Sequence, residues 1–171
     1  MASMFNRNTR DRFRKRVYQL TPAHERRWGT MSPQKMICHL GDQLRLALGE
    51  IDGKPMPGPM HYAPMRWLAI YVIPWPHGFK GPPETFTTRA GEWEKDVTAL
   101  DSLLEEFAAR KGQRNWPDHP VFGKMSRRSW AALTCKHFDH HHGPLRRHHR
   151  QAGRRASRAL VEPIVCARMR R

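Results

Sequence analysis

The sequence predicts an all-α protein, a four-helix bundle with one long crossover between its second and third helices. Two observations predict this fold. Four segments repeat apolar residues every three or four positions, the spacing that places side chains on one face of a helix. The second and third segments are separated by the crossover, residues 50–88, which is rich in proline and glycine. Four helices with one long connection form a known variant of the four-helix bundle, whose sites are built from side chains on facing helices.

Two of the four expected helices have simple amphipathic patterns. The first covers residues 9–20, and its apolar face is formed by Phe13, Val17 and Leu20. The third covers residues 93–111, and its apolar face is formed by Trp93, Val97, Leu100, Leu104 and Phe107. Acidic residues in its first turns and basic residues in its last turn complement the helix dipole, and Gly112 is expected to end it.

The other two expected helices carry histidines on their apolar faces. The second covers residues 32–48, with an N-cap serine, a proline at the first helical position and a closing glycine. His39 belongs to its apolar stripe, so this imidazole is expected to face the core. The fourth helix covers residues 126–141 and carries His137 and His141 on the same face.

The spacing of these histidines predicts a metal site. His137 and His141 are four residues apart, so their imidazoles point the same way and can share one ion. Imidazole suits Zn, Ni, Cu and Fe, and a metal needs more than two protein ligands to stay bound. We therefore predict a divalent-metal site formed by His39, His137 and His141. The alternative is that these are surface or capping histidines.

Other polar residues near the predicted ligands have simpler explanations. Asp42 follows His39 by three residues and would either orient that imidazole or lie at the bundle rim, which we favour. Asp139 is expected to meet solvent or a lysine, and His140 to be a surface residue or a fallback ligand. His119 is expected in a structural turn. Helical positions also place tryptophans in the core: Trp28, Trp67, Trp93 and Trp130.

Composition narrows the class of protein. The chain of 171 residues is long enough for one domain with a core, and 39% of it is hydrophobic. Its longest apolar run, residues 67–73, is far too short to span a membrane, and residues 1–16 have no apolar stretch typical of a secretory signal. The three cysteines, Cys38, Cys135 and Cys166, lack metal-ligand spacing. A cytoplasmic location is therefore expected.

Half of the net charge of +16 lies at the C-terminal end. Residues 143–171 contain nine arginines and one acidic residue, Glu162, which gives this segment +8. A basic tail can bind nucleic acid or another polyanion. This tail, however, has no aromatic residue that could stack on bases. Nucleic acid is therefore a disfavoured partner, and the alternative function is that of a non-catalytic basic helical module that binds nucleic acid or another polyanion through its ends.

Four stretches of the chain together resemble a bacterial family labelled DUF1569, within the DinB-like superfamily. The resemblance extends over about residues 10–142. It is carried by Arg27-Trp28-Gly29-Thr30-Met31-Ser32, by Met36-Ile37-Cys38-His39-Leu40-Gly41-Asp42, by His119-Pro120-Val121-Phe122-Gly123-Lys124-Met125, and by the segment from Trp130 to His141.

The resemblance implies a bundle in up-down-down-up order with a divalent metal held by three histidines. On this sequence the corresponding positions are His39, His137 and His141, the three that helical spacing selects. Members of the superfamily include metal-dependent enzymes that use low-molecular-weight thiols. The resemblance therefore implies a thiol-dependent transferase or a hydrolase that acts on a small electrophile, with Zn, Ni or Fe as the metal and a thiol as a further cofactor. Whether the chain is an enzyme stays open, and so does whether it forms a homodimer.

The chain departs from the family directly after His141. Relatives continue this helix with an ending that packs on the bundle, whereas here Gly143 and Pro144 follow. Proline would clash with the carbonyl group four residues earlier, at a cost of about 3 kcal/mol, so the helix is expected to end here. We therefore divide the chain into a bundle domain, residues 1–142, and an Arg-rich tail, residues 143–171. We expect the tail to be disordered or the product of a shifted reading frame.

Overall fold

The structure is a computed structural model that describes residues 2–25, 29–79 and 81–142. Within these ranges it contains five α-helices, three short 3-10 helices and no β-strand, which confirms the all-α fold class. The α-helices are α1 (Arg7–Tyr18), α2 (Pro33–Leu48), α3 (Ala63–Tyr71), α4 (Trp93–Ala109) and α5 (Arg127–His142). The 3-10 helices are η1 (Pro59–His61), η2 (Pro83–Phe86) and η3 (Arg110–Gly112).

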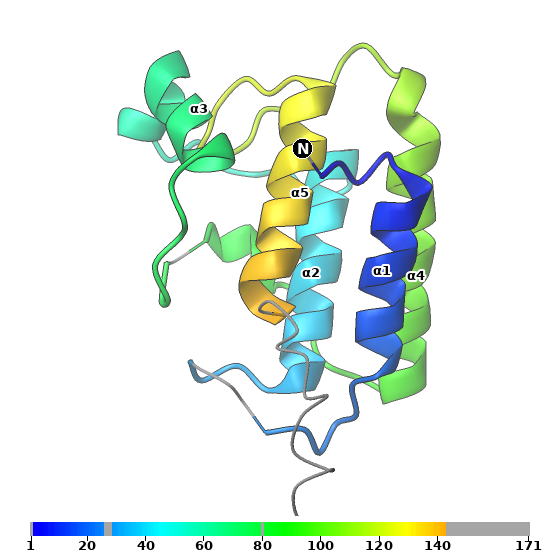
Figure 1. The fold of residues 1–171 in the computed structure, drawn as a ribbon. Helices are drawn as coiled ribbons and strands as arrows, with labels where there is room; N and C mark the ends of the chain where they lie inside the picture. Colours follow the sequence, from blue (N-terminus) through cyan, green and yellow to red (C-terminus); the bar gives the residue numbers. More distant parts are fainter. Residues whose placement is uncertain (1, 26–28, 80, 143–171) are drawn as a thin grey trace, which may run out of the picture.

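Four of the helices, α1, α2, α4 and α5, lie side by side, and α3 lies outside them on the side of α5 (Figure 1). The colours along each ribbon show that α2 and α4 run in one direction and α1 and α5 in the other (Figure 1). Because α2 and α4 are parallel neighbours, the chain must return along a helix of 16 residues, about 24 Å long, before α4 begins. The crossover makes this return and contains α3, η1 and η2.

Local capping sets where the helices begin and end. The Asn6 side chain accepts a hydrogen bond from the Thr9 backbone N–H, so α1 starts two residues before the predicted position. Ser32 caps α2 through Lys35 N–H, and Gly49 ends it with a φ of 77°, a left-handed conformation that favours glycine. The second helix therefore has the predicted bounds within one residue.

Aromatic side chains fill the core between the four long helices. Trp130, Phe13, Phe107 and Phe138 are fully buried. Phe13 of α1 meets Phe138 of α5 edge to face, with ring centroids 5.4 Å apart. Each such side chain contributes about 1.5–3 kcal/mol when it is fully buried. The aromatic core thus holds α5 against α1.

Three sequence predictions need correction or stay untested. Trp67 is not a core residue, because it lies on α3, outside the bundle, and is 56% exposed. Asp139 is exposed to solvent, as expected, but its cationic partner is an arginine and not a lysine: its carboxylate pairs with Arg16 of α1 at 2.7 Å. The tail, residues 143–171, and Trp28 lie outside the described residues, so the domain division and the account of the tail stay predictions.

No helix in the described part of the chain combines the length and the apolar character that crossing a membrane requires.

Candidate metal centre

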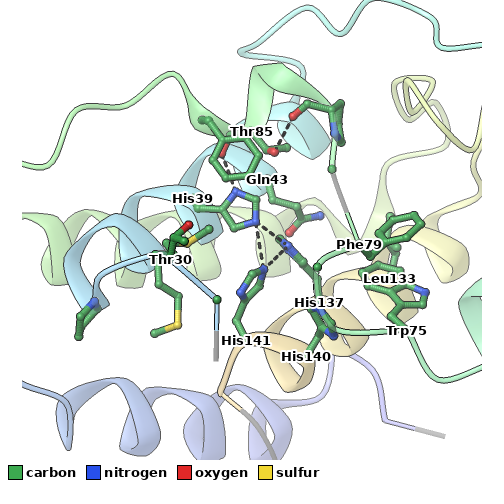
Figure 2. A pocket seen from close by; sticks show the side chains of 18 of the residues that line it. Thr30, His39, Gln43, Trp75, Phe79, Thr85, Leu133, His137, His140 and His141 are labelled. Carbon is green, nitrogen blue, oxygen red and sulfur yellow. Dashed lines mark hydrogen bonds between the residues drawn. The ribbon is translucent and has the colours of Figure 1, made fainter. Parts of the chain in front are cut away.

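Three imidazoles from two helices converge at one point, and they are the three that the sequence predicts. His39 comes from α2, and His137 and His141 come from α5 (Figure 2). The Nε2 atom of His39 lies 2.9 Å from that of His137 and 3.1 Å from that of His141, and the last two are 3.1 Å apart. His39 and His137 are buried, and His141 is half-buried. The three ligand atoms therefore form a nearly equilateral triangle.

The crossover fixes the orientation of His39. Its Nδ1 atom lies 2.7 Å from the carbonyl oxygen of Thr85 in η2 and donates its proton there. A neutral imidazole carries one N–H, so the lone pair is left on Nε2, the atom that faces the other two histidines. Phe86 stacks on the same imidazole, with ring centroids 4.3 Å apart. A carbonyl that orients a ligating histidine in this way is a common feature of metal sites.

Burial keeps His39 and His137 neutral. Removal from water lowers the pKa of His39, although the Thr85 carbonyl opposes this shift. Burial, followed by the neighbouring His39, lowers the pKa of His137 well below its usual value. A histidine must be neutral to bind a metal. These two imidazoles are therefore in the form that a metal requires at neutral pH.

The geometry and chemistry of the triangle fit a metal ion. Two nitrogens bound about 2.0–2.1 Å from one ion lie about 2.9 Å apart at a right angle and about 3.4 Å apart in a tetrahedron. The observed separations of 2.9–3.1 Å lie at the short end of this range. Hydrogen bonds alone cannot satisfy the cluster, because His39 Nε2 has no proton and each partner brings at most one. One cation would satisfy all three atoms.

Asp42 is neither a rim residue nor a direct partner of His39. It is fully buried, and its carboxylate accepts hydrogen bonds from the backbone N–H groups of Thr87 and Thr88, each 2.8 Å long. Arg45, one turn further along α2, pairs with the same carboxylate at 3.2 Å. Asp42 thus binds the end of the crossover to α2, and so holds the segment whose Thr85 carbonyl orients His39.

A pocket of about 600 Å³ opens beside the triangle. Its lining includes all three histidines and residues from the crossover, among them Trp75, Phe79 and Phe86. Trp75 stacks on Phe79, with ring centroids 5.4 Å apart, and its ring lies 6.2 Å from that of His137. The crossover therefore supplies much of the apolar wall. The size is ordinary for a small-molecule site.

The remaining histidines near the pocket have other roles. The His119 Nδ1 atom accepts hydrogen bonds from the backbone N–H groups of Val121 and Phe122, so this residue is the turn-forming histidine that the sequence predicts. His140 lies beside Trp75 and His77, with ring centroids 5.8 and 6.2 Å away. Its ring points to the crossover and not into the triangle (Figure 2).

The two described cysteines are poor nucleophiles. Burial, followed by the carboxylate of Asp96, raises the pKa of Cys38 to about 11. Burial, followed by the carboxylate of Asp139, raises the pKa of Cys135 to about 12. The thiolate is the reactive form, and almost none of it exists in either residue at neutral pH. Cys166 lies outside the described residues.

Sequence reasoning missed the residues of the crossover and Gln43. Thr85, Trp75 and Phe86 carry no motif, and their contribution depends on how the crossover folds back over α2. Gln43 could have been found, because it follows His39 by four residues and so lies on the same face of α2.

Comparison with known proteins identifies the family. A model of the DinB superfamily matches residues 6–145, which is most of the chain. The chain therefore belongs to the DinB superfamily. No curated protein and no solved structure matches it.

Proposed function

We propose that the chain binds one divalent metal ion through His39, His137 and His141, and that the pocket beside this ion binds a small molecule. The convergence of the three Nε2 atoms within 3.1 Å of one another carries this proposal. Membership of the DinB superfamily supports it, because a three-histidine site suits a helical bundle of this kind. We also propose that the chain belongs to the DUF1569 branch, on the basis of the sequence stretches that resemble it.

The pocket supports a chemical role for the metal. Three protein ligands leave open positions, as catalytic metal sites do and closed structural sites do not. A divalent metal bound there would supply Lewis acidity, which lowers the pKa of a coordinated thiol or water. The chain itself positions the three lone pairs and surrounds them with the apolar wall of the pocket.

A thiol from outside the chain fits this site better than a cysteine of its own. Cys38 and Cys135 are both protonated at neutral pH, and neither lines the pocket. We therefore propose a thiol-dependent transferase or a hydrolase acting on a small electrophile, with Zn, Ni or Fe as the metal and a low-molecular-weight thiol as the source of sulfur in the first case.

The test is metal stoichiometry in protein purified without an affinity tag. Wild type should hold one divalent ion per chain by mass spectrometry and should take it up again after treatment with a chelator. His39→Ala, and the double variant His137→Ala with His141→Ala, should lose it. Replacement of His148 and His149 by alanine is the matched control and should leave one ion per chain.

The opposite pattern would refute the proposal, since loss of the ion only in the control would place metal binding in the tail. The alternative function, binding of a polyanion, predicts affinity that falls steeply with salt and survives loss of the three histidines.

A further inference from the structure

Gln43 has a buried amide oxygen without a partner at the edge of the histidine triangle. Its side chain is 3% exposed and lines the same pocket as His39, one helical turn away on α2 (Figure 2). The Oε1 atom has no hydrogen-bond partner among the described residues. Buried carbonyl oxygens normally accept a hydrogen bond from protein, water or ligand. The missing donor points to a ligand.

Thr134 holds the other end of this amide. The Nε2 atom of Gln43 donates to Thr134 Oγ1 over 3.3 Å, and Thr134 is fully buried. Thr134 precedes His137 by three residues on α5, so the two share a helix face. Gln43 and His137 line the same pocket (Figure 2). Because the amide nitrogen is directed at Thr134, the oxygen is the polar atom of this amide that is left without a partner.

Aromatic rings form the wall that begins at the same point. Phe86 stacks on His39, and Trp75 lies 6.2 Å from His137 and stacks on Phe79. Phe79 and Phe86 are 38% and 53% exposed, so their faces are available to a ligand. One end of the pocket thus offers lone pairs and an acceptor, and the wall beyond it offers flat apolar surfaces, which aromatic rings bind well.

We propose that the pocket binds a small molecule with an aromatic body and a head group that both binds metal and donates a hydrogen bond to Gln43 Oε1. This rests on the proposed function, because the head group lies at the three-histidine end. Gln43 is then a residue that determines specificity: it favours ligands that carry a donor over ligands of the same shape that lack one.

Two hydroxamic acids test this directly. Benzohydroxamic acid and N-methylbenzohydroxamic acid bind metals through the same two oxygens, but only the first has an N–H. Calorimetric titration of metal-loaded, full-length protein should show a preference for the first of roughly five- to tenfold, the effect of one neutral hydrogen bond. Acetohydroxamic acid, which lacks the ring, should bind at least about tenfold more weakly than benzohydroxamic acid.

Variants then assign the preference to one atom. Gln43→Met keeps the length of the side chain and removes the acceptor, so the ratio of the two affinities should fall to about one, while metal affinity is retained. Met36→Leu changes another residue of the pocket lining and should keep the wild-type ratio. The added methyl group has the same steric cost in all three proteins, so a change in the ratio reports the hydrogen bond.

Several results would overturn the inference while the metal site stands. In wild type, these results are an equal affinity for the two benzohydroxamic acids, or an affinity for acetohydroxamic acid equal to that for benzohydroxamic acid. In Gln43→Met, they are an unchanged ratio of the two affinities or loss of the metal itself. If Gln43→Met does not fold, the ligand pair in wild type decides alone. Failure of the proposed function is distinct, because wild type would then hold no stoichiometric metal.

Discussion

Three imidazoles whose nitrogens face one another, two of them buried and one half-buried, destabilise a bundle that holds no metal. Buried polar groups destabilise a fold unless they are hydrogen-bonded. Here at most two of the three contacts between His39, His137 and His141 can be hydrogen bonds, and His137 Nδ1 has no partner among the described residues. The same contacts become favourable when a cation lies among the lone pairs. The cluster is therefore better explained by binding than by stability.

This reasoning predicts opposite effects of one substitution with and without metal. In chelator, His137→Leu should be at least as stable as wild type, because a buried polar group without a full set of partners is replaced by an apolar one. With metal at about one hundred times its Kd, wild type should gain about 2.7 kcal/mol and the variant nothing. Chemical denaturation measures both.

A packing variant provides the control for that experiment. Phe138→Ala lies next to His137 and removes a fully buried ring, so it should lose about 3–5 kcal/mol in both conditions. A His137→Leu protein that is as destabilised as Phe138→Ala in chelator would show that the histidines stabilise the bundle without metal.

His119 predicts how the fold responds to acid. Burial, with a smaller contribution from His61, lowers the pKa of His119 to about 3. The unfolded chain binds this proton below a pH of about 6.5 and the folded chain does not. The effect of His119 on the free energy of unfolding is therefore absent above pH 6.5. As the pH drops from 6 towards 4, this residue alone lowers the free energy of unfolding by roughly 1.4 kcal/mol per pH unit.

His119→Asn separates this contribution from those of the other histidines. Asparagine keeps an acceptor for the N–H groups of Val121 and Phe122 but does not titrate. Below pH 6, the stability of His119→Asn should fall less steeply than that of wild type. The difference between the two slopes should be roughly 1.4 kcal/mol per pH unit. Equal slopes in urea titrations from pH 7 to pH 4 would contradict the assignment.

At the scale of the residue, sequence could predict which histidines converge but not what surrounds them. The spacing of His137 and His141 and the apolar position of His39 follow from helical periodicity alone. The same reasoning failed for Asp42. Its partners, Thr87 and Thr88, are about forty-five residues away in the sequence and meet it only when the crossover folds back. Contacts between a helix and an irregular segment leave no period in the sequence.

At the scale of the element, a lysine of α5 helps to hold α3 to the bundle, beside the buried Ala69 and Ile70 and the hydrogen bond from Tyr71 to Ser129. The Lys136 ammonium donates to the carbonyl oxygens of Ala69 and Ile70, at 2.7 and 3.3 Å, in the last turn of α3. It also lies 5.7 Å from the centre of the Trp75 ring. A cation at the C-terminal end of a helix satisfies carbonyl groups that have no helical partner. Lys136 thus connects the crossover to α5 directly before His137.

Lys136→Met should loosen the crossover while the bundle stays folded. We expect a loss of about 1–3 kcal/mol and faster hydrogen exchange in residues 63–75, because charged hydrogen bonds are replaced by an apolar contact. The pocket should also bind its ligand more weakly, since Trp75 is part of its wall. Lys95→Met, at an exposed residue paired with Glu92, is the control and should change neither property.

Periodicity predicted the elements well where a helix packs on another helix. All four expected helices begin and end within two residues of their predicted bounds, and η3 (Arg110–Gly112) covers the end of the third predicted segment after α4 ends at Ala109. Periodicity does not settle whether residues 65–73 form a helix, because two apolar side chains of α3, Trp67 and Met65, are exposed. A helix that packs through a single edge has no full apolar stripe to detect.

The basic residues of α1 illustrate how charge is used inside the bundle. Arg10 pairs with Glu105 of α4 at 3.0 Å, Arg14 pairs with the same glutamate, and Arg16 is buried against Asp139 of α5. Although partial burial of Glu105 opposes the shift, Arg10 and Arg14 lower the pKa of its carboxyl group. Three basic residues of α1 are therefore engaged within the molecule.

At the scale of the whole molecule, the two halves of the net charge lie in segments that differ strongly in their acidic residues. Residues 1–142 carry +8 spread over a domain in which many basic groups are paired, and residues 143–171 carry +8 in 29 residues with one acidic partner. Electrostatic attraction for a polyanion grows with the number of basic groups that can reach its phosphates. Any such activity is therefore expected to depend on the tail, whereas metal binding is expected to depend on the bundle.

Truncation after His142 separates these properties. The removed segment has only five large aliphatic residues, Leu145, Leu160, Val161, Ile164 and Val165, without a sustained helical spacing. The melting temperature and the metal stoichiometry should therefore stay nearly unchanged, because burial of apolar surface is the main source of stability. Binding to an anionic polymer such as heparin should weaken, and its dependence on salt should become shallower. A truncated protein that melts far below the full-length chain would show that residues 143–171 pack on the bundle, and our division of the chain would be wrong.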